Sequence, residues 1–344
     1  MNSVSVELYN LILSKKNEIA EDVLTRHFAI SPSLKTKYQQ FQIDHYIQDA
    51  EYTLTYLAES SFRGEAGLFI DYMKWCKIFF ASINLIDDEM YRFFDLLGER
   101  LLELPGVDKE SLVYGIFIKG IEVFDTTEPD DVSYIDADDP LGRVAAGYLD
   151  DLIAGDRRTA VERIMEAQRS GVSIKEIYEK IFKPVMWETG RLWHKGEISV
   201  AHEHFITAVT QLSMSQLYPY LFSSDNRKNR AVIVACVPDE LHEIGARMIA
   251  DFFEMEGWDS YFYGANTPTS SILKAIIENN IEVVALSATM TLHIPKVADL
   301  IAKIRSNPET SLVKIIVGGY PFNVMKVYGK RSEQTGMPGA LKKG

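Results

Sequence analysis

The stretch 239–245, Asp-Glu-Leu-His-Glu-Ile-Gly, contains the residues with the clearest capacity for chemistry. His242 follows Glu240 by two residues, so the carboxylate can accept a proton from one ring nitrogen and leave the other free and basic for a metal. Gly245 has no side chain and would let the backbone approach a bulky group. The alternative is a loop histidine that is only hydrogen-bonded by a neighbouring carboxylate.

The elements on either side of His242 place it in a loop between a strand and a helix. Residues 231–237 are all apolar, which is typical of a strand buried on both faces. Residues 246–253 have helical periodicity. Open α/β sheets bind ligands at the carboxyl ends of their strands. We therefore predict a ligand site around His242.

Glu240-x-His242-x-x-Gly245 resembles the Asp/Glu-x-His-x-x-Gly signature of cobalamin-binding domains. In that family the histidine replaces the cofactor's own benzimidazole base as the lower ligand to cobalt, and the displaced nucleotide tail enters the sheet. The resemblance implies this role for His242, with Glu240 orienting its ring.

Two further markers of the same family occur downstream, each after a predicted strand. Ser287 and Thr289, in the order Ser-Ala-Thr, follow an apolar run at 283–286, and Gly318-Gly319 follow residues 312–317. In the family these positions line the channel for the nucleotide tail. The three markers occur in the expected order, which favours a cobalamin site over a simple loop histidine.

A second motif precedes this region. Trp193 is followed by nine residues and then by Glu203-His204, which resembles the Trp-x9-Glu-His motif of adenosylcobalamin-dependent photoreceptors. The resemblance implies that Trp193 covers the upper face of the corrin and that Glu203 and His204 surround the adenosyl group. His194 stands where that family has the histidine that becomes the upper cobalt ligand after light removes the adenosyl group.

Two plainer interpretations compete for these residues. A zinc site is disfavoured because His202 and His204 lie two steps apart on one helix, about 200° around it, and cannot chelate one ion together. Alternatively, Trp193 and its neighbours only pack in a helical core. The agreement between this motif and the His242 motif favours the photoreceptor interpretation.

We predict an α plus α/β protein with three parts joined by short segments. Residues 1–125 read as five helices, at about 4–24, 34–59, 66–83, 87–104 and 109–123, and resemble globin-like helical sensor modules. In the third helix we expect Phe69, Tyr72, Trp75, Cys76 and Phe79 to point largely one way, as core packing rather than a chromophore cage. Residues 126–140 form an acidic linker with two prolines.

Residues 141–222 read as a four-helix cap, a unit that methionine synthase, methanogenic corrinoid proteins and cobalamin photoreceptors share. Ser173 begins a capping box and starts the third helix, Pro184 should kink that helix, and Ser199 can cap the fourth. Residues 230–344 alternate strands and helices, which predicts a flavodoxin-like parallel sheet. At 325–334 the chain departs from the family pattern, so the edge of this domain is expected to be altered.

Composition narrows the class of protein. The 344 residues carry a net charge of −13, which would repel phosphate backbones and argues against direct nucleic-acid binding. The polar start is not a signal peptide, and no apolar run is long enough to cross a membrane. The two cysteines, Cys76 and Cys236, lie in apolar segments and give no disulfide framework. We expect a cytoplasmic protein.

These observations together predict a light-sensing signalling protein, rather than an enzyme, that binds adenosylcobalamin between the cap and the α/β domain. Residues 190–193 and 240–253 resemble photocobilins most, which implies that a bilin such as biliverdin accompanies the cobalamin. The signal would leave through homo-oligomerisation or a downstream signalling partner. The alternatives are a corrinoid carrier protein of a methyltransferase system, which needs an open upper face, and a helical scaffold with a ligand-free α/β domain.

Overall fold

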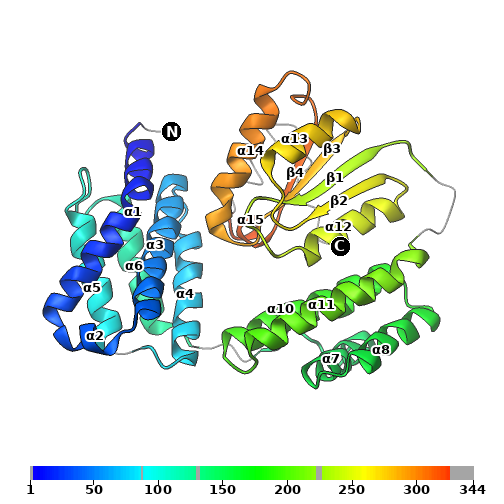
Figure 1. The fold of residues 1–344 in the computed structure, drawn as a ribbon, viewed down its shortest axis with the longest axis horizontal. Helices are drawn as coiled ribbons and strands as arrows, with labels where there is room; N and C mark the ends of the chain where they lie inside the picture. The colour runs from blue at the N-terminus through cyan, green and yellow to red at the C-terminus, as the bar shows by residue number, and fades with distance from the viewer. Residues whose placement is uncertain (1–2, 87, 129–131, 222–226, 326–344) are drawn as a thin grey trace. The chain divides into compact units, whose positions relative to one another are not determined.

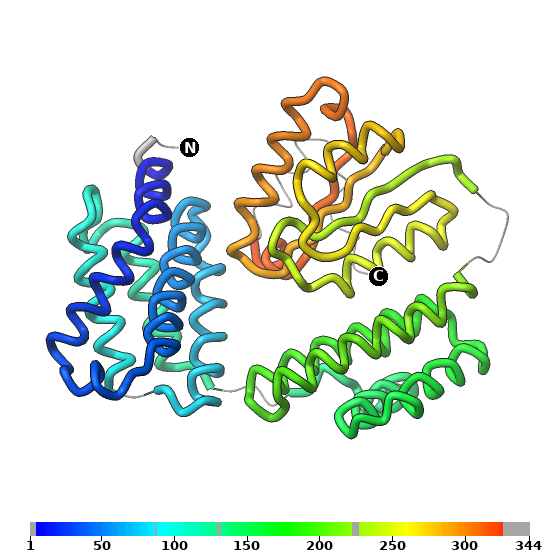
Figure 2. Tube along the Cα trace, in the orientation of Figure 1, coloured from blue at the N-terminus to red at the C-terminus, as the bar shows by residue number. Residues whose placement is uncertain are grey.

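The computed structural model describes residues 3–86, 88–128, 132–221 and 227–325, and shows helical regions followed by a parallel α/β domain, as predicted (Figures 1 and 2). By contacts the chain divides into two compact units, Met1–Pro129 and Asp130–Gly344. The predicted C-terminal irregularity at 325–334 falls almost entirely outside the described residues.

The first unit is helical. It contains α1 (Ser3–Ile30), α2 (Pro32–Lys37), α3 (Gln40–Arg63), α4 (Gly67–Ser82), α5 (Asp88–Leu102) and α6 (Leu112–Thr126). The single helix predicted at 34–59 is wrong, because the chain breaks at Tyr38 and Gln39. Gln39 has an extended backbone and forms a capping box with Gln42, which starts α3 afresh.

Aromatic side chains fill the core of this unit. Phe69, Tyr72 and Cys76 of α4 are buried, and the rings of Tyr56 and Tyr72 stack at 4.1 Å between centroids. Trp75 is 39% exposed and stacks on Phe79 with ring centroids 5.0 Å apart. At 100° per residue it lies about 60° from Tyr72 and 100° from Cys76, so it stands at the edge of the buried face, and the five residues point largely one way as predicted.

Helices also open the second unit. They are α7 (Pro140–Ile153), α8 (Arg157–Arg169), α9 (Ile174–Glu176), the π-helical turn η1 (Ile177–Phe182), α10 (Lys183–His194), α11 (Val200–Leu217) and the 3-10 turn η2 (Tyr218–Tyr220). Ser173 and Ser199 cap α9 and α11 as predicted. The kink predicted at Pro184 takes the form of the π-helical turn directly before it, where the ring removes one backbone donor.

The α/β part contains β1 (Ala231–Cys236), α12 (Ile244–Met255), β2 (Asp259–Gly264), α13 (Thr269–Glu278), β3 (Val283–Ser287), the 3-10 turn η3 (Thr291–His293), α14 (Ile294–Ser306), β4 (Lys314–Gly318) and α15 (Tyr320–Val324). The four strands are parallel in the order β2-β1-β3-β4. Alternate residues of β1 face opposite sides of this sheet, as the two-residue period of a strand requires.

Helix α12 lies between the sheet and the cap helices. Ala246 and Ala250 on one side of α12 pack with Val232 and Val234 of β1. On its other side, Ile244 and Met248 belong to the cap's hydrophobic core. The opposite face of the sheet packs on α13 and α14 (Figure 1). The helix that follows His242 is therefore fixed from both directions.

Candidate functional site

Glu240 is the centre of a buried hydrogen-bonded cluster at the end of β1. Glu240 is fully buried. Its Oε1 accepts hydrogen bonds from His242 Nδ1 at 2.6 Å and from the His242 backbone N–H at 2.9 Å. Its Oε2 accepts from the Thr289 N–H at 2.5 Å and from His293 Nδ1 at 2.9 Å. A carboxylate with this many donors is stabilised in its charged form.

The ionised state of Glu240 fixes the role of the histidine. Burial opposes ionisation, but hydrogen bonds from His242 and His293 outweigh it and hold the pKa of Glu240 well below its usual range. An ionised carboxylate can only accept, so Nδ1 of His242 carries the proton. Nε2 makes no hydrogen bond to any described residue, and in the neutral imidazole it keeps its lone pair. This is the tautomer that a metal ligand requires.

The His242 side chain is exposed to solvent, whereas the Glu240 carboxylate that it contacts is buried. Its side chain is 61% exposed, whereas that of Glu240 is 0% exposed. The hydrogen bond to Glu240 raises the pKa of His242, burial opposes this, and the charges of Glu240 and Glu203 add to the rise. Glu203 belongs to α11, and a residue further along the same helix, Gln211, contacts the His242 loop at Glu243.

His293 was not predicted, although the sequence contained a signal for it. It is 4% exposed and ends the 3-10 turn that follows β3. Carboxyl ends of parallel strands meet at one edge of a sheet, so a histidine six residues after Ser287 could have been expected near the loop after β1. The ion pair of Lys296 with Asp239 joins the same two segments.

The predicted tail-channel residues also meet at this edge. In the strand register Cys236 is paired with Ser287, and Ser287 with Gly318. Gly319 has φ +115, and a Cβ there would lie 1.9 Å from the backbone oxygen of Ala288. Only glycine fits, so the backbones after β3 and β4 approach unusually closely.

Open space adjoins this edge. A Cβ added at Gly245 or at Gly318 would meet no atom within 4 Å, and Leu241 is 71% exposed beside His242. The surroundings of His242 thus combine one available nitrogen, two glycines facing open space and an exposed apolar side chain. This donor set fits a large, partly apolar group that already holds its own metal and needs one axial ligand.

The four cap residues lie on two consecutive helix ends. Trp193 and His194 occupy the last turn of α10, where both are partly buried and Trp193 packs against the cap core. Glu203 and His204 occupy the first turns of α11 and contact each other at 2.6 Å, while Thr207 donates to Glu203 at 3.0 Å. The side chain of His204 is 75% exposed.

Contacts between α11 and α12 hold the cap against the sheet. Gln211 donates to Glu243 at 2.6 Å, and Glu243 also accepts from the Ala265 N–H at 2.8 Å. Arg247 donates to Ser215 at 2.9 Å. From Gln211 back to Glu203 the helix extends about 12 Å, at 1.5 Å per residue. Glu203 and His204 lie at the far end of this stretch, and Glu243 directly follows His242 in the chain.

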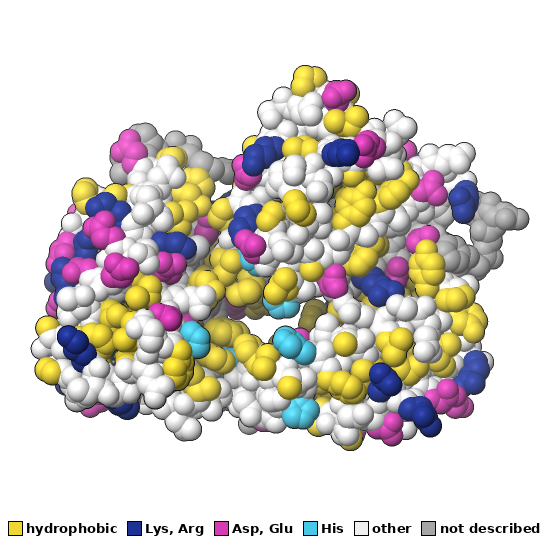
Figure 3. All heavy atoms as spheres, viewed as in Figure 1, with side chains coloured by type: hydrophobic (Ala, Val, Ile, Leu, Met, Phe, Trp, Pro, Cys, Tyr) yellow, Lys and Arg dark blue, Asp and Glu magenta, His cyan; other side chains and the backbone are white. Residues whose placement is uncertain are grey.

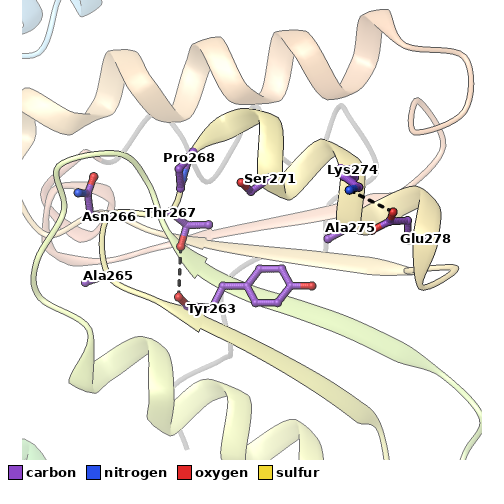
Figure 4. A pocket seen from close by; sticks show the side chains of 9 residues that line it. All are labelled: Tyr263, Ala265, Asn266, Thr267, Pro268, Ser271, Lys274, Ala275 and Glu278. Carbon is purple, nitrogen blue, oxygen red and sulfur yellow. Dashed lines mark hydrogen bonds and ion pairs between the residues drawn. The ribbon is translucent and has the colours of Figure 1, made fainter.

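A shallow hollow of about 460 Å³ lies beside the loop after β2 (Figure 4). Asn266, Thr267 and Pro268 line it, together with residues of α13. The Asn266 side chain accepts from the Asp239 N–H at 2.8 Å, and the Asn266 N–H donates to the Glu240 carbonyl. The loop after β2 therefore braces the loop that carries His242.

Surface charge is mixed. On the face drawn in Figure 3, acidic and basic side chains are interspersed among the described residues. No described helix is long and apolar enough to cross a membrane.

Two segments of the chain match family models, both described as B12 binding domain, over residues 144–218 and 230–331. Among curated proteins, dimethylamine corrinoid protein 3 of Methanosarcina acetivorans is 22% identical over 171 residues, covering 50% of this chain and 80% of the relative. The trimethylamine corrinoid protein of Methanosarcina barkeri is 25% identical over 171 residues, covering 48% and 77%.

Among solved structures, the Methanosarcina barkeri monomethylamine corrinoid protein aligns with a TM-score of 0.48 at 20% identity, covering 57% of this chain and 91% of that one. A cobalamin-binding protein from Desulfitobacterium hafniense aligns with a TM-score of 0.31 at 23% identity, covering 57% and 89%. The two family models and the curated relatives support a cobalamin-binding chain, and the curated relatives are named as corrinoid proteins.

Proposed function

From the two B12-binding segments that this chain carries, we propose that it holds a corrinoid cofactor with His242 as the lower axial ligand to cobalt. The observation that carries the proposal is the exposed imidazole of His242 on a fully buried, ionised Glu240. That pairing fixes the tautomer and raises the basicity of the free nitrogen. We place the chain among cofactor-binding proteins rather than enzymes.

The strand ends supply the rest of the proposed binding site. Ser287 at the end of β3 and Thr289 beyond it, with Gly318 at the end of β4 and Gly319 beyond it, would take the nucleotide tail. Gly245 would leave room for the corrin edge, because a Cβ there would face open space.

The finer proposal is a light sensor that uses the adenosyl form of the cofactor. When bound, adenosylcobalamin supplies a cobalt–carbon bond that light can break. Trp193 would cover the upper face, and Glu203 with His204 would enclose the adenosyl group. His194 would be the residue available to ligate cobalt once the adenosyl group is lost, since a tethered neutral imidazole has a higher effective concentration than a free ligand. The support is the residue motif and the contact of α11 with the His242 loop through Gln211 and Glu243.

The second candidate is a corrinoid carrier of a methyl-transfer system. The comparisons favour this function over light sensing, because the relatives are named as methylamine corrinoid proteins. A carrier needs the same lower ligand and an upper face that a partner methyltransferase can reach. It gives no role to the Glu203–His204 pair, which is the reason to retain both functions until they are tested.

Cobalamin binding is tested with His242→Ala. The purified chain is mixed with hydroxocobalamin, and the expected wild-type spectrum is that of cobalt with the benzimidazole displaced and an imidazole bound. The variant should lose that spectrum and bind at least tenfold more weakly. His45→Ala, an exposed histidine of the first unit, is the matched control and should behave as wild type. Equal spectra and affinities for His242→Ala and wild type would remove His242 from the site.

The two finer functions are separated with adenosylcobalamin in darkness and after illumination. A sensor should bind it in a manner that depends on Trp193 and Glu203, and should show a bis-imidazole spectrum after light. His194→Ala should bind normally in darkness, then leave water on the upper face and release the corrin sooner. A carrier should instead bind methylcobalamin equally well and show no dependence on His194.

A bilin in the first unit and output through an oligomer or partner remain proposals. The aromatic residues that motivated the bilin form a packed core, in which Phe69 and Phe117 are buried. Coexpression with a biliverdin supply should give red absorbance that disappears when residues 1–125 are deleted. Light scattering in darkness and after illumination should report a change in oligomeric state.

A further inference from the structure

A short segment of bends and turns, Ser133–Asp139, contacts both η1 and α10, the helix that carries Trp193. At one end the Tyr134 N–H donates to Glu188 Oε2 at 3.0 Å. At the other end Asp139 pairs with Lys180 at 3.3 Å. Between these anchors Ile135 packs against the cap core. We call this segment the strap.

The Glu188 anchor is difficult to release. Glu188 is 5% exposed and accepts hydrogen bonds from Arg191 at 2.6 and 3.0 Å as well as from the strap. Burial opposes its ionisation, but Arg191 and the Tyr134 N–H outweigh this and lower the pKa of Glu188. Withdrawing the strap would remove a charge-assisted bond from a buried carboxylate, so the strap and α10 are energetically coupled.

Aromatic contacts strengthen the same end. The rings of Tyr134 and Trp187 meet edge to face with centroids 5.5 Å apart, and Lys183 lies 4.7 Å from the Trp187 ring centroid. Both rings are 53% exposed. The strap therefore contacts α10 at its solvent-exposed side, where a substitution can change these contacts without disturbing the hydrophobic core.

The two anchors lie on opposite sides of a break in the helix. Lys180 is inside the π-helical turn η1, and Glu188 is in α10 beyond Pro184. A π turn and a proline are places where a helix changes direction. A change in the angle of α10 alters the separation of the two anchors, and the strap spans that separation.

The predicted cofactor face of α10 lies away from the strap. Glu188 and Trp193 are five residues apart, about 140° around the helix. Because backbone hydrogen bonds make a helix stiff, a displacement at Trp193 or His194 moves Glu188 as well. We propose that a cofactor-dependent change in the angle of α10 alters the conformation of the strap. This inference rests on the proposed corrinoid site.

The first test needs no cofactor. Hydrogen exchange is measured on the full chain for peptides covering 132–139 and 186–195. Glu188→Gln should speed exchange of the strap about tenfold, because a charge-assisted bond becomes a neutral one. Glu179→Gln, an exposed carboxylate in η1, is the control and should leave exchange unchanged. Tyr134→Ala removes an exposed ring and should speed exchange in both peptides, even if Glu188→Gln does not fold.

The second test adds hydroxocobalamin. In wild type, exchange of the strap should change at least threefold on binding. Glu188→Gln should bind hydroxocobalamin within about twofold of wild type but lose the cofactor-dependent change. If wild type does not bind cobalamin, the proposed function is contradicted. The coupling between the strap and α10 is then decided by the cofactor-free exchange measurements. Normal binding with an unchanged strap, or a Glu188→Gln variant that behaves as Glu179→Gln, would overturn the inference.

Discussion

Replacing Glu240 by Gln tests the buried support of His242 most directly. Four hydrogen bonds of 3.0 Å or less reach the Glu240 carboxylate, from two groups of His242, the Thr289 N–H and His293 Nδ1. A bond to a charged acceptor contributes about 1 kcal/mol more than one to a neutral acceptor. The amide of Gln also brings a donor to face these donors. We expect local opening to become easier by about 3 kcal/mol.

Hydrogen exchange of individual amides measures that change in the cofactor-free protein. The His242 and Thr289 amides both donate to Glu240, so both should exchange roughly a hundredfold faster in Glu240→Gln, since about 1.4 kcal/mol is one factor of ten. Glu256→Gln, whose side chain is 75% exposed, is the control and should leave both amides unchanged. A change smaller than threefold in Glu240→Gln would refute the view that this carboxylate organises the loop.

The pH dependence, the backbone contact after β4 and the link between cap and sheet give three further predictions. The pKa of Glu240 is lower in the folded protein than in the unfolded chain, so the ionised carboxylate stabilises the fold. This stabilisation is fully present above about pH 4.3 and is lost as the pH falls through the folded pKa. Amide exchange measured at decreasing pH should show the loss. Gly319→Ala should lower the free energy of unfolding by about 2–4 kcal/mol in urea titrations, whereas Gly318→Ala, which faces open space, should have a small effect. Tyr178→Phe should lower the free energy of unfolding by about 1–3 kcal/mol, because it removes a 2.7 Å hydrogen bond to the buried Asp251. Urea titrations of Tyr178→Phe, Asp251→Asn and the double variant should show that the two effects are not additive.

Much of the fold could be predicted because its signals are local. The fully apolar run at 231–237 can only be satisfied by burial on both faces, and it is β1. Ser173 and Ser199 predicted two helix starts, because serine is a common N-cap residue, and both serines cap helices in the structure. The break at Tyr38 was missed because helical periodicity continues across it, and only the paired side chains of Gln39 and Gln42 mark the restart.

The candidate site was predicted only in part. The distance of two residues between Glu240 and His242 is a local signal, and the structure shows their hydrogen bond. The contribution of His293 comes from 53 residues away and depends on which strands are neighbours in the sheet. The bond between Gln211 and Glu243 depends on how the cap docks, which neither helix reveals alone.

The long separation between Glu240 and its partners also affects how the site is made in the cell. Glu240 emerges from the ribosome 49 residues before Thr289 and 53 before His293. At about 5–20 residues per second, the nascent chain carries an unsupported His242 for roughly 3–10 seconds. During that interval His242 is present, but the hydrogen bonds from Thr289 and His293 that hold the Glu240 carboxylate in place are not yet formed. If His242 is the cobalt ligand that we propose, cofactor loading would follow translation of residues 289–293, and a metal ion met earlier would find a histidine whose protonated nitrogen is not yet fixed.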